Sequence, residues 1–140
     1  MTDREDITEV LVRYATGIDR RDWQLFRTVF TTDCALDYGD IGSWSGVDEV
    51  TTFMEQAHAM AGHTMHRLSN HAITIDGDTA SARTYVDGLI LGPDNASGVN
   101  AVGFYDDELV RTAEGWKIAR RRFTAVRVVG LAFGASDGVG

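Results

Sequence analysis

Apolar residues in the first third of the chain recur at helical spacing and predict three helices. The first helix follows a capping-box pattern, Thr2 with Glu5, and carries one apolar stripe made of Ile7, Val10, Leu11, Tyr14 and Ile18. A second, short helix is expected after the N-cap candidate Asp22, and its inward side chains are Trp23, Phe26, Val29 and Phe30. A third helix is expected over 47–60, preceded by a short strand over 35–38.

From Thr64 onward the pattern changes to strands separated by turn signals. The sequence Asp-Gly-Asp at 76–78 predicts a hairpin turn, after which the chain returns as far as Leu91. Two further strands are expected, over 100–111 and 116–129, after a loop rich in small residues. Helices followed by an antiparallel meander predict an α+β domain in which the helices cover one face of a curved sheet.

The composition is typical of a soluble globular protein, because 44% of the 140 residues are hydrophobic and 24% are charged. We expect residues 1–130 to form a single domain, and the glycine-rich segment 131–140 to be a loosely ordered tail. The 13 basic and 21 acidic residues give a formal net charge of −8. A surface of that sign repels phosphate groups, so binding to nucleic acids or to anionic membrane surfaces is not expected.

Three absences in the sequence indicate where the protein works. Cys34 is the only cysteine, which excludes an internal disulfide and a multi-cysteine zinc site. The chain begins with charged residues rather than an apolar segment, so no signal peptide is expected. No stretch of 18 apolar residues predicts a membrane span. The expected location is therefore the cytoplasm.

Asp19 is the first candidate for chemistry, because it lies near the C-terminal end of the first predicted helix. The negative end of the helix macrodipole disfavours an anion there. A partly buried carboxylate at this position therefore needs a cation or a hydrogen-bond donor. Position alone favours a structural explanation: Arg20 or Arg21 neutralises Asp19, or Asp19 caps the turn that follows.

Four histidines lie close together in the sequence, at His58, His63, His66 and His71. Their spacings of five, three and five residues match no common zinc motif. Two histidines five residues apart on one strand also point to opposite faces, so no metal site is expected. One histidine paired with a carboxylate is a simpler arrangement, and it is suited to general acid–base chemistry near neutral pH. His58 and His63 are expected to be solvent-exposed.

Two tyrosines and a run of three arginines are the remaining candidates for functional residues. Tyr14 lies in the core stripe of the first helix, where a tyrosine usually packs with its hydroxyl satisfied. Tyr38 ends a predicted strand, beside a glycine-containing loop at 39–42. The arginines at 120–122 alternate between faces of a strand, so pairing with nearby acids is expected. No nucleophile elbow, phosphate loop or dinucleotide fingerprint is present.

The chain resembles the SnoaL-like superfamily over about residues 7–129. The segments that carry the resemblance are Tyr14-Ala15-Thr16-Gly17-Ile18-Asp19-Arg20-Arg21-Asp22-Trp23, Leu36-Asp37-Tyr38, Met65-His66 and Gly115-Trp116-Lys117-Ile118. The resemblance implies a cone-shaped α+β barrel, with N-terminal helices packed in the concave face of a strongly curved, mostly antiparallel sheet.

The resemblance also implies an activity: a cofactor-independent lyase, dehydratase or isomerase. Scytalone dehydratase, bile-acid 7α-dehydratase and hexachlorocyclohexane dehydrochlorinase share an aspartate after the first helix and a histidine that opens a central strand. Asp19 and His66 match these two residues, while Tyr14 and Tyr38 match tyrosines near the substrate in the dehydratases. The second catalytic histidine and the serine of scytalone dehydratase are absent, because those regions hold Leu89 and Gly103.

The expected substrate is a hydrophobic, oxygenated small molecule of the steroid, polyketide or terpenoid type. The candidate substrate-binding residues are Phe26, Trp44, Met54, Met65 and Asp87. One alternative is a non-catalytic binding module or accessory subunit of the same fold. Another is an isomerase that uses Asp87 or Asp106 as its base.

A homo-oligomer, dimer or trimer, is also expected. Relatives associate through the outer face of the sheet, and Phe123, Val126 and Val128 on the last predicted strand could supply apolar contacts there.

Overall fold

The computed structural model describes residues 1–132, and within this range the chain forms helices first and a large sheet afterwards. The helices are α1 (Asp3–Asp19), α2 (Trp23–Arg27), the 3₁₀ turn η1 (Gly39–Ile41) and α3 (Val47–His58). The strands are β1 (Phe30–Asp37), β2 (Ser43–Ser45), β3 (Thr64–Asp76), β4 (Thr79–Leu91), β5 (Gly98–Thr112) and β6 (Gly115–Leu131).

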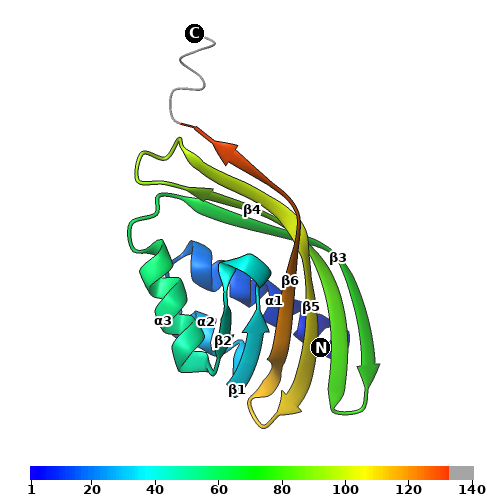
Figure 1. The fold of residues 1–140 in the computed structure, drawn as a ribbon. Helices are drawn as coiled ribbons and strands as arrows, with labels where there is room; N and C mark the ends of the chain where they lie inside the picture. The colour runs from blue at the N-terminus through cyan, green and yellow to red at the C-terminus, as the bar shows by residue number, and fades with distance from the viewer. Residues whose placement is uncertain (133–140) are drawn as a thin grey trace.

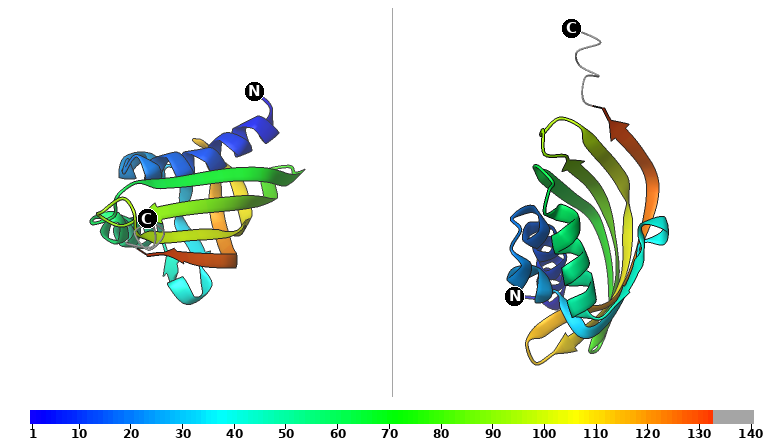
Figure 2. Two further views of the ribbon diagram at one scale, coloured as in Figure 1. Left: turned by 90° about the horizontal axis from the view of Figure 1, so that it is seen from above. Right: turned by 60° about the vertical axis from the view of Figure 1, so that its left-hand side comes forward.

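The six strands form one sheet in the order β2-β1-β6-β5-β4-β3 (Figure 1). Every neighbouring pair is antiparallel except β1 with β6, which is parallel. The long strands β3 to β6 bend strongly, and the helices lie in the concave face that this bend creates (Figure 2). The α+β class and the helix-filled, curved sheet expected from the sequence are therefore confirmed.

Helix α1 is fixed to the sheet by its own capping groups. The Thr2 hydroxyl accepts a hydrogen bond from the Glu5 backbone N–H, and the Glu5 carboxylate accepts one from the Thr2 backbone N–H, both at 3.1 Å. Asp3, the first residue of α1, accepts two hydrogen bonds of 2.8 Å from the guanidinium of Arg111 at the end of β5. It also accepts one from the Trp116 indole. The capping box therefore starts the helix, and Asp3 ties that start to the β5–β6 hairpin.

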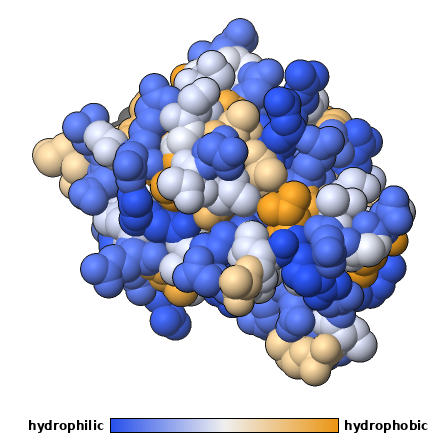
Figure 3. Space-filling view, turned by 90° about the horizontal axis from the view of Figure 1, so that it is seen from below, coloured by the Kyte–Doolittle hydropathy of each residue, from blue (hydrophilic) through white to orange (hydrophobic). Residues whose placement is uncertain are grey.

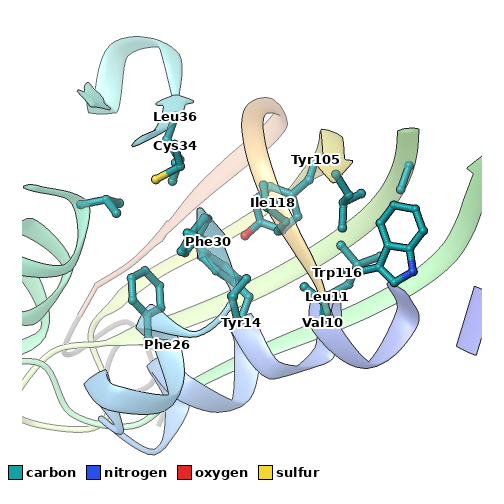
Figure 4. Close-up of a cluster of buried hydrophobic side chains, with 14 of the residues drawn as sticks. Val10, Leu11, Tyr14, Phe26, Phe30, Cys34, Leu36, Tyr105, Trp116 and Ile118 are labelled. Carbon is teal, nitrogen blue, oxygen red and sulfur yellow. The ribbon is translucent and has the colours of Figure 1, made fainter. Parts of the chain in front are cut away.

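The core lies between α1 and the concave sheet face (Figure 4). Tyr14 of α1 packs against Phe26 of α2 and Phe30 of β1, with ring centroids 5.4 and 5.9 Å apart. Each fully buried side chain of this size contributes about 1.5–3 kcal/mol through removal from water. The helices are thus held in place mainly by apolar packing around these rings.

The outer face of the sheet is charged. Strand β4 alternates strictly, with Ala80, Ala82, Thr84 and Val86 buried and the residues between them exposed. On the outer face Arg83 pairs with Asp106 at 2.7 Å, and Arg122 lies 3.6 Å from Asp37. Seen from below, the surface is mostly hydrophilic with small, separate apolar patches (Figure 3).

One residue expected on that outer face lies inside the cone. Phe123 packs against the rings of Tyr38 and Tyr105, at 5.7 and 5.5 Å. In the β5–β6 register Phe123 lies opposite Tyr105, which also lines the cavity. Val126 and Val128 are exposed, at 68% and 56%. The oligomer remains a prediction, and Phe123 is removed from its proposed interface.

The boundaries of three elements differ from the sequence-based expectation. The second helix ends at Arg27, and Phe30 already opens β1, which extends the strand expected over 35–38. The third helix ends at His58 rather than residue 60.

The tail expected at 131–140 lies outside the described residues from position 133 onward. Within residues 1–132 no helix combines the length and the apolar character needed to cross a membrane.

Candidate active site

Asp19 and His66 form a tightly hydrogen-bonded pair. Asp19 is the last residue of α1, and His66 is the third residue of β3. The His66 Nδ1 and Asp19 Oδ1 atoms lie 2.7 Å apart, and the His66 backbone N–H donates to Asp19 Oδ2 at 2.8 Å. Because the carboxylate is an acceptor, Nδ1 carries the hydrogen and the other ring nitrogen, Nε2, holds a free lone pair.

The donors around Asp19 also compensate for its burial. Burial by itself disfavours the charged carboxylate, but the hydrogen bonds from the His66 ring, the His66 backbone and the Thr64 hydroxyl outweigh it. The pKa of Asp19 consequently lies below its ordinary value of 3.8. Arg21 does not contact Asp19 directly; its guanidinium donates to Thr64 Oγ1 at 2.8 Å and to the Gly62 carbonyl at 2.6 Å. The sequence-based alternative of direct neutralisation by Arg21 is therefore not what the structure shows.

This arrangement predicts a pH dependence of stability. Since the pKa of Asp19 is lower in the folded than in the unfolded chain, its stabilising contribution is complete above about pH 4 and is lost as pH falls through the folded value. Asp19→Asn should therefore lower the free energy of unfolding at pH 6 and have progressively less effect toward pH 2. Urea unfolding of both proteins across this range tests the sign. A constant difference at all pH values would contradict it.

A cavity of about 240 Å³ lies between the helices and the concave sheet face, beside His66. Most of its wall is apolar, with Ile18 from α1, Phe53 and Met54 from α3, and Val86 and Ile90 from β4. Its polar groups are few, namely the side chains of Tyr14, Tyr38, His58, His66 and Tyr105. An apolar pocket with a few convergent polar groups is typical of a small-molecule site.

Two tyrosine hydroxyls meet in this cavity wall. The hydroxyl oxygens of Tyr14 and Tyr38 lie 2.6 Å apart. Burial, reinforced by the neighbouring Tyr14, raises the pKa of Tyr38 well above its ordinary value of 10, and burial does the same for Tyr105. The phenols of Tyr38 and Tyr105 are therefore neutral near pH 7, and a neutral phenol can donate a hydrogen bond to an oxygen of a bound molecule.

A buried ion pair lies beneath these rings. Arg121 and Asp107 are joined by two hydrogen bonds of 2.7 and 2.9 Å, and neither side chain has any solvent exposure. The Arg121 guanidinium carbon lies 4.2 Å from the centroid of the Tyr14 ring and 3.8 Å from that of the Tyr105 ring. The middle arginine of the 120–122 run is thus a core residue. Arg120 and Arg122 face outward and lie near Glu108 and Asp37, as alternation predicts.

The structure separates the predicted substrate-binding residues into three groups. Met54 lines the cavity. Phe26 is fully buried in the core, and Trp44 lies behind the wall, where it packs against Tyr38 and Phe53 at 5.3 and 4.5 Å. These two support the cavity without lining it.

Met65 and Asp87 lie on the opposite face of the sheet from the cavity. Met65 is 55% exposed, and Asp87 pairs with Arg67 at 2.8 Å. Each is adjacent in sequence to a cavity residue, His66 or Gly88, and successive side chains of a strand point to opposite faces. The expectation that Met65 and Asp87 contact the substrate is therefore corrected, because neither side chain faces the cavity. Asp106 likewise faces outward, so neither aspartate has the position that a carboxylate base would need.

The sequence analysis missed most of the cavity-lining residues, His58, Tyr105 and Phe123 among them. His58, expected to be exposed, is half-buried, donates a hydrogen bond from Nδ1 to the Met54 carbonyl oxygen and packs on Trp23. Burial lowers the pKa of His58 below its ordinary value of 6.5. Tyr105 and Phe123 lie on inward positions of β5 and β6, and the alternating pattern of β5 contained a signal for Tyr105. Among the described residues, no group of three or more histidine, cysteine, aspartate or glutamate side chains is arranged to hold a metal ion.

A curved sheet that holds helices and a cavity in its concave face defines the nuclear transport factor two-like cone fold. Residues 1–122 match the model of the SnoaL-like domain, and the chain belongs to this family. An uncharacterized protein of Mycobacterium tuberculosis is 32% identical over 123 residues, which cover 86% of this chain and 84% of the relative.

Solved structures share the same fold. A protein of Novosphingobium aromaticivorans, provisionally assigned as an aromatic ring hydroxylase, is 34% identical with a TM-score of 0.85 over 91% of this chain and 92% of its own. A provisionally assigned scytalone dehydratase of the same species is 20% identical with a TM-score of 0.84, over 92% and 87% of the two chains. A hexachlorocyclohexane dehydrochlorinase of Novosphingobium barchaimii is 16% identical with a TM-score of 0.81, over 92% and 90%.

Proposed function

We propose that this protein is a cofactor-independent lyase or isomerase that removes a proton from carbon in an oxygenated, apolar small molecule. The observation that carries the proposal is the His66–Asp19 pair at the wall of an apolar cavity that also holds two adjacent tyrosine hydroxyls. A base, its orienting carboxylate and hydrogen-bond donors for oxygen are the parts that such a reaction needs.

In this proposal His66 is the general base. Its Nε2 lone pair takes a proton from a carbon that a neighbouring carbonyl or leaving group makes acidic. Asp19 holds the ring in the required tautomer and stabilises the imidazolium that forms. The electrons of the broken C–H bond either expel a leaving group, which completes an elimination, or return to a proton at another carbon, which completes an isomerisation.

Tyr14 and Tyr38 are assigned to the substrate oxygen. One of the two hydroxyls donates its hydrogen to the other, so the pair has one O–H left to donate to a carbonyl oxygen as it gains negative charge, or to a departing hydroxyl group. Donors of this kind act more strongly beside an apolar wall than in bulk water.

The fold is one that carries eliminations in other proteins. Structures of the same fold include proteins named for dehydration and dehydrochlorination, both of which are eliminations. The 34% identical structure is provisionally assigned as an aromatic ring hydroxylase; hydroxylation is a different reaction, and only the cyclic nature of the ligand is common to that name and this proposal.

The test is deuterium incorporation from heavy water. Cyclic ketones and hydroxyketones are incubated with the protein in D₂O, and exchange of the hydrogen next to the carbonyl is followed by NMR, with thermal shift as a separate measure of binding. Exchange faster than in buffer supports the proposal. Binding without exchange contradicts it and supports the alternative, a non-catalytic binding module. A ligand at a hundred times its Kd should stabilise the protein by about 2.7 kcal/mol.

A further inference from the structure

The cavity floor next to His66 is made of unusually small residues. Strand register places His66 of β3 opposite Gly88 of β4, and Gly88 opposite Ala101 of β5. All three line the cavity. A Cβ atom at Gly88 would lie 3.4 Å from His66 Cδ2 and 3.7 Å from His66 Nε2. The space beside the ring edge that carries Nε2 therefore exists because residue 88 has no side chain.

The ring nitrogen beside this space has no protein partner. The His66 side chain is only 10% exposed. Its Nδ1 is bonded to Asp19, while Nε2 has no hydrogen-bond partner among residues 1–132. Nε2 is not one of the fully buried unpaired side-chain atoms, so it is reachable from the cavity and is free to accept a hydrogen bond or a proton from a bound molecule.

The volume limits how large that molecule is. An apolar cavity of roughly 150 Å³ accommodates benzene. The cavity beside His66 measures about 240 Å³, which can enclose one ring or two fused rings, whereas a molecule of four rings would extend beyond its wall. Its wall is apolar apart from the histidine and tyrosine side chains, so the ring system has to be apolar with few oxygen atoms.

We propose that the cavity selects oxygenated molecules of one or two fused rings, and that Gly88 and Ala101 are its specificity-determining residues. The ring lies on the floor formed by these two residues, its reacting carbon faces His66 Nε2, and its oxygen points toward Tyr14 and Tyr38. The assignment of a reacting carbon rests on the proposed function, whereas the size limit rests only on the cavity.

The test compares 2-cyclohexenone, 2-tetralone and androst-4-ene-3,17-dione, which have one, two and four rings. Binding is measured by thermal shift and by quenching of tryptophan fluorescence, and reaction by deuterium exchange in D₂O. The wild-type protein should bind 2-tetralone at least about tenfold more tightly than the four-ring ketone. Gly88→Ala, which fills the space beside Nε2, should weaken 2-tetralone binding by about tenfold or more, since one methyl group in a pocket has an effect of this order.

Gly130→Ala is the matched control, because a Cβ atom there meets nothing within 4 Å and Gly130 also lies on a strand. It should leave binding unchanged. Ala101→Val fills the same floor from β5 and provides a second variant if Gly88→Ala does not fold. Equal affinity for two-ring and four-ring ketones, no binding of any probe, or unchanged 2-tetralone binding in both filled variants would overturn the proposal. Selective binding without deuterium exchange would uphold the size limit and contradict only the proposed reaction.

Discussion

Asp19→Asn is expected to slow turnover of a true substrate by about a hundredfold to ten-thousandfold, while ligand affinity stays nearly unchanged. The amide keeps the size of the carboxylate but removes its negative charge. His66 then loses the partner that stabilises its protonated form, and an amide N–H can donate to Nδ1 and favour the wrong tautomer. Affinity should be preserved because Asp19 lies behind His66 and does not line the cavity.

Deuterium exchange and ligand-induced thermal shift, measured on the same preparations, separate these two effects. Asp106→Asn is the control, because it makes the same chemical change on the outer sheet face, where Asp106 pairs with Arg83. The variant His66→Gln, which removes the base, sets the lower limit of activity. Exchange by Asp19→Asn at the wild-type rate would refute the pair as the source of activity.

Asp107→Asn is expected to lower the free energy of unfolding by about 3–5 kcal/mol. The substitution leaves the Arg121 guanidinium charged and fully buried among aromatic rings, without the carboxylate that now receives both of its hydrogen bonds. A buried charge without a partner cannot recover the hydration that it loses on folding. Urea unfolding at pH 7 measures the effect.

Asp106 again provides the comparison, because it is adjacent in sequence but faces outward. Its pair with Arg83 is exposed, so Asp106→Asn should cost no more than about 1 kcal/mol. The double variant Asp107→Leu with Arg121→Met should recover most of the stability, since apolar residues of similar volume commonly replace a buried ion pair without loss. Equal losses for Asp106→Asn and Asp107→Asn would show that burial of the pair has no special energetic effect.

Local periodicity predicted the elements of this fold well, because it depends on residues a few positions apart. The capping box of α1 and the hairpin at 76–78 follow from such signals, and both occur in the structure. The Asp19–His66 pair joins residues 47 positions apart, and only the family resemblance brought them together. The periodicity of apolar residues in a sequence does not show which face of a helix packs against which strand.

The errors have a shared physical origin in strand parity. Met65 and Asp87 were grouped with cavity residues although each neighbours an inward residue in the chain and must therefore point away. Phe123 was grouped with Val126 and Val128 on the outer face, although it lies three and five residues from them and regular alternation already places it on the other face. The irregularity between Val102 and Gly103 then sets Val128 opposite Ala101, a cavity residue. A β-bulge changes the parity of all residues beyond it, and the sequence gives no direct sign of one.

Helix α1 begins and ends with an aspartate that binds the sheet, Asp3 to Arg111 and Asp19 to His66. The pKa of Asp3 is lowered to about 2 by its hydrogen bonds to Arg111, and that of Asp19 is also lowered, so both tethers persist in mildly acidic solution. Stronger acid neutralises both carboxylates and so weakens the polar contacts at both ends of the same helix together. The backbone hydrogen bonds of the sheet do not titrate, so we expect acid to leave α1 held by apolar packing alone and to loosen it before the sheet.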